Sequence, residues 1–131
     1  MSLDRATRRL VRQRAADRCE YCQRLQIDSL LIPLQIEHIL PHKHGGGDEV
    51  ENLALACAEC NLHKGSDLSG IDPESNQMTR LFDPRRDDWN EHFVWQGVRI
   101  AGSTAIGRTT VRVLQMNAPA RVKVRLVTRR P

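Results

Sequence analysis

The sequence predicts a small α+β fold formed by one domain over residues 1–131. Two short segments that alternate apolar and polar residues are joined by a glycine-rich loop, and a short helical segment follows them. A C-x-x-C pair stands at each end of this stretch, so that the order is strand, loop, strand and helix between two cysteine pairs. An arginine-rich helix is expected before this core and a small α/β extension after it.

The first predicted element is a helix that leads into the first cysteine pair. In the stretch SLDRATRRLVRQRAADR, Leu3, Ala6, Leu10 and Val11 fall near one face, and arginines occupy the rest of the surface.

The central segment supplies the two strands and the short helix. Leu34 and Ile36 alternate with polar residues, which is typical of a short strand, and Pro41 closes it. ENLALAC is typical of a second strand, and AECNLHKG of a helix that ends at Gly65. SDLSGIDPES is then predicted to be a loop.

The extension, about residues 80–131, is less informative. Trp89, Phe93 and Trp95 are expected to pack in the core, because the chain has few aromatic residues. GRTTVRVLQMN predicts a helix with Thr104 as its cap. The final RVKVRLVTRR alternates basic and apolar residues, which favours a strand, with a helix as the alternative.

Charge is unevenly distributed along the chain. Met1–Arg18 has six basic and two acidic residues, Cys19–Val98 has six and fourteen, and Arg99–Pro131 has eight and none, which gives +4, −8 and +8. Basic ends suit surfaces that hold phosphate, and an acidic middle suits a site that collects cations. Solvated arginines on ordinary helices are the alternative interpretation.

The four cysteines, Cys19, Cys22, Cys57 and Cys60, form two C-x-x-C pairs with none left over. A two-residue gap lets both sulfurs of a turn face one ion at about 2.3 Å, so two pairs can bind one tetrahedral Zn²⁺. Disulfides would suit a secreted chain, and a redox pair would not need a second pair. We therefore expect a structural zinc that stabilises a chain with only 4% aromatic residues.

The residues CEYC and IEHILPHKHGGGDEVENLALACAECNLHKG resemble the HNH endonuclease family in its zinc-containing, four-cysteine form, which is built on the ββα-metal (His-Me) finger. The resemblance covers Cys19–Gly65 and implies hydrolysis of nucleic acid. By resemblance, Glu37 takes the acid position, His38 the first histidine, Asn52 the asparagine, and Asn61 the last position. A similar tail, from L-F-x-P-R through G-R-x-T-V, accompanies many bacterial members.

Phosphodiester hydrolysis needs a base for water and a cation for the negative charge on phosphate. A histidine titrates near neutral pH, so His38 fits the base. Glu37 and Asn61 offer oxygen ligands for Mg²⁺, or another divalent ion such as Mn²⁺ or Ni²⁺. Neighbours on a strand face opposite sides, so Glu37 and His38 share a site only where the strand ends or twists. We expect Asn52 to bind backbone across the loop and to orient His38.

Other residues receive supporting roles. His63 is a substitute or additional metal ligand, and a second metal contact from His42 or His44 is left open. The residues expected to contact nucleic acid are His42, Lys43, Lys64, Arg85 and Arg86. Three glycines let the loop swing wide beside a nucleic-acid backbone, although they would also suit a simple linker.

We expect a metal-dependent endonuclease, with DNA favoured as the substrate by the resemblance alone. The alternative is a zinc-stapled nucleic-acid-binding module without catalysis, or an accessory subunit that acts with a protein partner in a larger nuclease complex. No stretch approaches the roughly 20 apolar residues of a membrane span, and the first eighteen residues carry six arginines. A cytoplasmic protein without a membrane partner is therefore expected.

Overall fold

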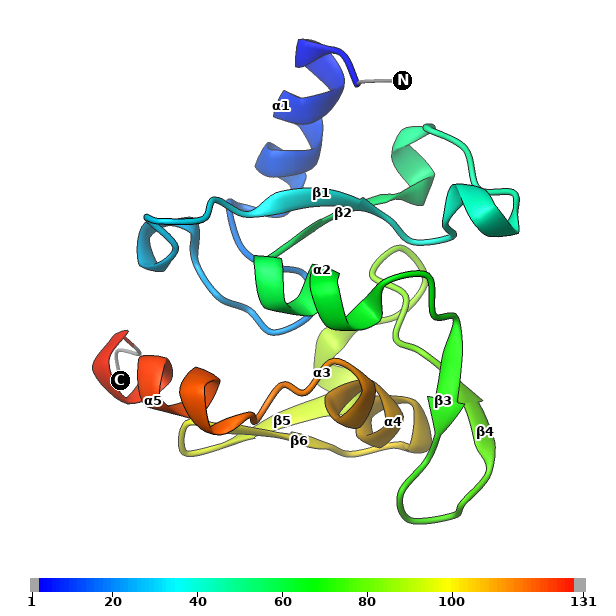
Figure 1. Cartoon of the computed structure of the whole chain (residues 1–131), viewed down its shortest axis with the longest axis vertical. Helices are drawn as coiled ribbons and strands as arrows, with labels where there is room; N and C mark the ends of the chain where they lie inside the picture. The colour runs from blue at the N-terminus through cyan, green and yellow to red at the C-terminus, as the bar shows by residue number, and fades with distance from the viewer. Residues whose placement is uncertain (1–2, 129–131) are drawn as a thin grey trace. The chain divides into compact units, whose positions relative to one another are not determined.

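The computed structural model describes residues 3–128 and divides them into two compact units (Figure 1). The first unit holds the described residues up to Ser66 together with Asp83–Arg86, and the second holds Asp67–Phe82 and the described residues from Asp87 onward. Both units combine helices with antiparallel hairpins, so the predicted α+β class is confirmed. A single domain over residues 1–131 stays a prediction.

The first unit begins with helix α1 (Arg5–Arg14), where the sequence predicted one. The carboxylate of Asp4 accepts a hydrogen bond from the amide of Thr7 at 2.7 Å and caps the first turn. The helix ends four residues before the predicted segment does, because Ala16 and Asp17 have φ angles of 55° and 51°. Its buried residue, Val11, contributes to the core of the unit.

Strands β1 (Gln35–His38) and β2 (Leu53–Ala56) form the expected antiparallel pair, with Gln35 opposite Ala56 and His38 opposite Leu53. All four residues of β2 are buried. On the α1 side, the guanidinium of Arg12 donates to the carbonyl of Leu34 at 2.9 Å, and that of Arg14 donates to the carbonyl of Leu53 at 2.6 Å. These two arginines therefore join the helix to the hairpin.

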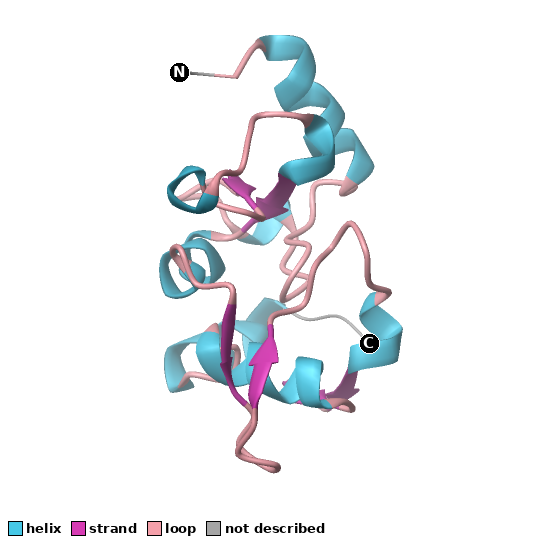
Figure 2. Cartoon of the chain, turned by 90° about the vertical axis from the view of Figure 1, so that its right-hand side faces the viewer, coloured by secondary structure: helices cyan, strands magenta, loops and turns pink. Residues whose placement is uncertain are grey.

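Helix α2 (Ala58–Lys64) follows β2 directly, and Figure 2 shows the hairpin and helices of this unit. The Cys57 sulfur accepts from the amide of Cys60 and caps the helix, and Gly65 ends it with a φ of +49°. The predicted order of strand, loop, strand and helix is confirmed. Short 3-10 helices occur at Gln26–Asp28, at His42–His44 (η2) and at Val50–Asn52 (η3).

The second unit begins with a hairpin that the sequence did not predict. The expected loop contains strand β3 (Ser69–Ile71), which pairs with β4 (Met78–Arg80). The buried carboxylate of Asp72 organises the turn by accepting the hydroxyl of Ser75 at 2.7 Å, and Asn76 adopts a φ of 61°. Turn-forming residues dominate this stretch, so its two three-residue strands gave no clear alternation.

Helix α3 (Trp89–His92) precedes a hairpin of β5 (Phe93–Gln96) and β6 (Arg99–Gly102), against which helix α4 (Ala105–Val113) packs. The expected aromatic packing is confirmed in part: the ring centroids of Trp89 and Phe93 lie 5.0 Å apart and those of Trp89 and Trp95 lie 5.9 Å apart, but only Phe93 is buried and both tryptophans are half-buried. The expected cap of α4 is confirmed as well, since the hydroxyl of Thr104 accepts from the amide of Gly107 at 3.1 Å.

The strand favoured for the final segment is wrong, and helix α5 (Pro119–Thr128) is present instead. Pro119 starts the helix, where its missing N–H costs nothing. The guanidinium of Arg121 donates to the carbonyl of Leu114 at 2.8 Å, and that of Arg125 donates to the carbonyl of Val98 at 3.1 Å. Tertiary hydrogen bonds thus use side chains that were expected to face a substrate. Residues 129–131 lie outside the described residues.

Within residues 3–128, none of the helices has the length and apolar character needed to cross a membrane.

Candidate functional site

The four cysteines converge in the first unit, as their spacing predicted. Cys19, Cys22, Cys57 and Cys60 are buried, and their sulfurs lie within 4.8 Å of one another. The sulfurs of Cys22 and Cys57 are 3.6 Å apart, close to the roughly 3.8 Å between two thiolates of a tetrahedral zinc site. The four side chains form a buried tetrad that is compatible with a structural zinc.

Two of the four thiols, those of Cys19 and Cys60, lose their protons less readily in this environment unless a cation is bound. Burial raises the pKa of Cys19 and of Cys60 well above the usual range of a thiol. A bound dication reverses this tendency, because it stabilises each thiolate directly. Backbone amides already point at the sulfurs, with the amide of Cys22 3.4 Å from the Cys19 sulfur. The tetrad therefore has the donor set and the surroundings of a structural zinc site.

A second cluster forms around His38 at the end of β1. The Nε2 atom of His38 lies 2.7 Å from Oδ1 of Asp48, and Nε2 of His42 lies 3.0 Å from the same oxygen. The two histidine nitrogens are 3.1 Å apart. The imidazole of His38 is 28% exposed and that of His42 is 58% exposed, so water and solutes reach the cluster. Hydrogen bonds from His38 and His42 lower the pKa of Asp48, which is ionised at neutral pH.

Asn52 fixes the loop that carries this cluster. Its amide group accepts from the amide of Leu40 at 2.8 Å and donates to the carbonyls of Leu40 and Gly47 at 2.9 Å. The expected backbone hydrogen bonds across the loop are therefore observed. Gly46 lies under them, and a Cβ at this position would come within 1.6 Å of the carbonyl oxygen of Leu40. This glycine permits a close approach of two backbone segments and is no mere linker residue.

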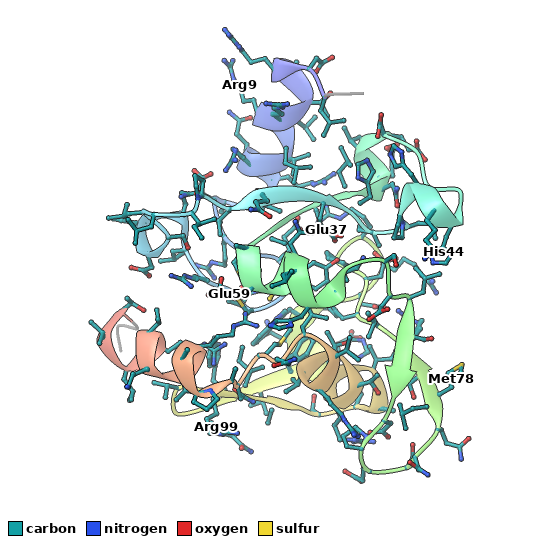
Figure 3. The ribbon with its side chains drawn as sticks, in the orientation of Figure 1. Arg9, Glu37, His44, Glu59, Met78 and Arg99 are labelled. Carbon is teal, nitrogen blue, oxygen red and sulfur yellow. The ribbon has the colours of Figure 1, made fainter. Side chains whose placement is uncertain are left out.

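Glu37 precedes His38 on β1, but its side chain has different partners. Its carboxylate is 3% exposed and accepts the hydroxyl proton of Tyr21, while its other oxygen lies 3.2 Å from the ammonium of Lys64. Burial raises the pKa of Glu37, and the positive charge of Lys64 opposes this shift. Lys64 also donates to the carbonyl oxygens of His38 and Ile39 at 3.3 and 3.0 Å. Figure 3 shows Glu37 beneath the β1 ribbon.

Asn61 lies on the same side of β1 as Glu37. The amide nitrogen of Asn61 donates to Oε1 of Gln35 at 2.7 Å, which leaves its own carbonyl oxygen available. The side chains of Gln35 and Glu37, two positions apart, lie on the same face of the strand, and Asn61 and Lys64 are one helical turn apart. Glu37 and Asn61 therefore belong to one interface between β1 and α2. Glu37 is not part of the cluster of His38, His42 and Asp48, and the amide nitrogen of Asn61 binds Gln35 instead.

Residues 19–67 match the family model of the HNH endonucleases. This segment is an HNH domain. The match covers the cysteine tetrad, both strands, the loop and α2. HNH domains act on nucleic acid, so the domain indicates nuclease activity. No curated protein and no solved structure matches the chain.

The remaining candidate residues lie in several places in and around the HNH domain. Lys43 is exposed on η2 and His63 is partly buried on α2. Arg85 forms an ion pair with Glu20, whereas Arg86 is exposed. Lys64, expected to meet phosphate, is 3% exposed in its side chain and holds Glu37. Of the candidates for phosphate contact, His42, Lys43 and Arg86 are the exposed ones.

Two residues of the HNH domain that the sequence analysis missed complete the arrangement. Asp48 follows the three glycines directly, and Tyr21 lies between the first two cysteines. The position of Asp48 after a flexible turn that follows His42 could have indicated a carboxylate returning towards the histidines. No sequence signal identifies the hydroxyl of Tyr21 as a partner of Glu37, because that pairing depends on how the knuckle packs on β1.

Proposed function

We propose that this chain is a metal-dependent endonuclease that hydrolyses phosphodiester bonds, with DNA as the first substrate to test. The observation that carries the proposal is the position of His38. It lies in a matched HNH domain, at the end of β1, with a partly exposed imidazole whose Nε2 is bonded to a carboxylate.

The contact with Asp48 supports His38 as the general base. When Nε2–H donates to Asp48, the neutral ring keeps its lone pair on Nδ1, and that atom can accept a proton from water. The ionised carboxylate also stabilises the imidazolium that forms. Asp48 thus acts as a positioning residue that selects the tautomer, while Asn52 keeps the loop in place.

Glu37 and Asn61 would hold the divalent ion, for which Mg²⁺ is the first choice and Mn²⁺ or Ni²⁺ the alternatives. Their carboxylate and amide oxygens have the donor chemistry that a hard cation prefers, and both lie at the interface of β1 with α2. When bound, the ion would stabilise negative charge on the phosphate and on the leaving oxygen. Without the ion, Lys64 neutralises the carboxylate of Glu37; for the ion to bind, the ammonium of Lys64 would have to leave that carboxylate oxygen.

The basic surface supplies attraction for the backbone of nucleic acid. Exposed arginines of α1, together with Lys43 and Arg86, carry charge that the internal hydrogen bonds of the fold do not consume; the α1 residues are Arg5, Arg8 and Arg9. Such contacts to phosphate are independent of sequence and weaken as salt rises. We therefore expect nicking with little sequence preference and a steep dependence on salt.

The test is incubation of zinc-loaded protein with supercoiled plasmid in Mg²⁺, Mn²⁺ or EDTA, for the parent chain, for His38→Ala and for His44→Ala. His44 is an exposed histidine on η2 and serves as the matched control. We expect metal-dependent nicking by the parent and the control, and a loss of at least 100-fold in His38→Ala while binding persists. Undiminished nicking by His38→Ala would refute the assignment of the base.

A second candidate function has a specific observation in its favour. Both oxygens of Glu37 are engaged and its side chain is 3% exposed, which suits a zinc-stapled binding module or an accessory subunit of a larger nuclease complex. Binding of nucleic acid without cleavage in any metal would favour that function.

A further inference from the structure

Three potential ligand atoms converge on one side of the loop after β1. They are Nε2 of His38, Nε2 of His42 and Oδ1 of Asp48, with separations of 2.7, 3.0 and 3.1 Å. They come from the end of β1, from the first residue of η2 and from the residue after the glycines. The same turn carries His44, labelled in Figure 3.

Hydrogen bonds alone do not satisfy this triangle. If both histidines donate to Asp48, their two N–H groups face each other across 3.1 Å. If His42 donates to His38 instead, the lone pair of His38 is used and no proton lies between His38 and Asp48, which are 2.7 Å apart. One edge of the triangle is therefore repulsive in either arrangement of neutral rings.

A divalent cation removes this conflict, because all three lone pairs can then point at one positive charge. Adjacent ligands of an octahedral ion with bonds of about 2.1 Å are about 3.0 Å apart. The observed separations of 2.7 to 3.1 Å match one face of such an octahedron. The three side chains are 28%, 58% and 26% exposed, so an ion can enter and water can fill its remaining positions.

We propose that His38, His42 and Asp48 form a second metal site, for a divalent transition-metal ion such as Zn²⁺ or Co²⁺. Two imidazoles and one carboxylate favour these ions over Mg²⁺, which prefers oxygen ligands and gives up water reluctantly. Asn52 pins both ends of the loop through backbone hydrogen bonds, so His42 and Asp48 are held near His38 before an ion arrives. The site lies apart from the thiol tetrad.

Occupancy of this site controls the base, a consequence that rests on the proposed function. A neutral imidazole bonded to a metal through Nε2 carries its proton on Nδ1. His38 then has no lone pair with which to accept a proton from water, and Asp48 no longer selects the active tautomer. Zn²⁺ at the second site therefore inhibits nicking that Mg²⁺ supports.

The first arm of the test measures binding without substrate. Protein with zinc in the tetrad is titrated with Co²⁺, and the visible absorption of bound Co²⁺ is followed in the parent, His42→Ala, Asp48→Asn and His44→Ala. We expect a bound Co²⁺ without thiolate charge-transfer absorption, whose affinity is at least tenfold lower in His42→Ala and Asp48→Asn but unchanged in His44→Ala. Equal affinity in all four proteins, no additional Co²⁺, or binding through thiolates would overturn the site.

The second arm measures nicking in Mg²⁺ as Zn²⁺ is added. We expect inhibition of the parent and of His44→Ala, with at least tenfold more Zn²⁺ needed for His42→Ala relative to its own uninhibited rate. Co²⁺ binding with no inhibition by Zn²⁺ would refute the control of His38 by the ion. Absence of nicking in every metal would contradict the proposed function instead, while the Co²⁺ titration would still decide whether the site exists.

Discussion

Replacing Lys64 by methionine tests whether a buried charge holds β1 against α2. The ammonium of Lys64 has three acceptors, an oxygen of Glu37 at 3.2 Å and the carbonyls of His38 and Ile39 at 3.3 and 3.0 Å. Methionine fills a similar volume without the charge, so Glu37 is left buried with only the hydroxyl of Tyr21 as a donor. Breaking a buried pair from one side costs about 3–5 kcal/mol.

Protonation of Glu37 limits the loss of stability in Lys64→Met. At pH 7, protonating a carboxyl whose ordinary pKa is 4.5 costs about 3.4 kcal/mol, at about 1.4 kcal/mol for each pH unit. We therefore expect Lys64→Met to lose about 3 kcal/mol at pH 7. Glu37 of the folded variant then binds a proton that the unfolded chain lacks, so the variant becomes more stable as the pH falls. The stability lost relative to the parent shrinks by about 1.4 kcal/mol from pH 7 to pH 6.

The assay is urea unfolding with hydrogen exchange of peptides from β1 and α2, at pH 6 and 7. Lys43→Met makes the same change at an exposed lysine and should cost less than about 0.5 kcal/mol. Lys64→Met combined with Glu37→Gln should recover much of the stability, because no charge is then left buried. A loss below about 1 kcal/mol in Lys64→Met, equal at both pH values, would refute the reasoning.

Three further changes separate the parts of the molecule. Asn52→Ala should destabilise the loop by about 2 kcal/mol and slow nicking, since it removes three backbone hydrogen bonds; unchanged hydrogen exchange there would contradict this. Asp72→Asn should lower the urea midpoint of the second unit, followed by fluorescence of the two tryptophans, both in that unit. Hydrogen bonds from Arg108 lower the pKa of Asp72, so this stabilisation exists at neutral pH and the difference should vanish as pH falls well below 3.8; a constant difference would oppose it. Cys57→Ser should abolish one bound zinc per chain, measured by elemental analysis, and zinc retained at parental stoichiometry would exclude the tetrad.

The HNH core was predictable because its signals are local and dense. Paired cysteines at a two-residue gap, a short alternating segment and a glycine stop after a helix each correspond to one structural cause. The tetrad, the hairpin and α2 accordingly form where the sequence predicted them. The backbone hydrogen bonds of Asn52 could also be predicted, since an amide side chain beside a loop has few other groups to bind.

The parts that escaped prediction depend on contacts between distant residues. The partners of Glu37 are Tyr21, 16 positions away, and Lys64 on α2, and neither contact has a pattern in the sequence. Helix α5 reads as an alternating strand because its basic residues look solvent-facing, yet Arg121 is 7% exposed and donates to the carbonyl of Leu114. Tertiary hydrogen bonding decided its conformation, and periodicity carried no information about it.

The position of the tetrad in the chain has a consequence for the order in which the protein matures. Cys22 and Cys57 are 35 positions apart, and His38, the glycine turn and Asn52 all lie between them. An ion that joins the four thiolates turns this stretch into a closed ring, which removes about 4 kcal/mol of chain entropy from the unfolded state. His38 and Asn52 then have few conformations to search. Activity would therefore depend on the supply of zinc. Without the ion the ring would stay open, although every residue of the site is present in the chain.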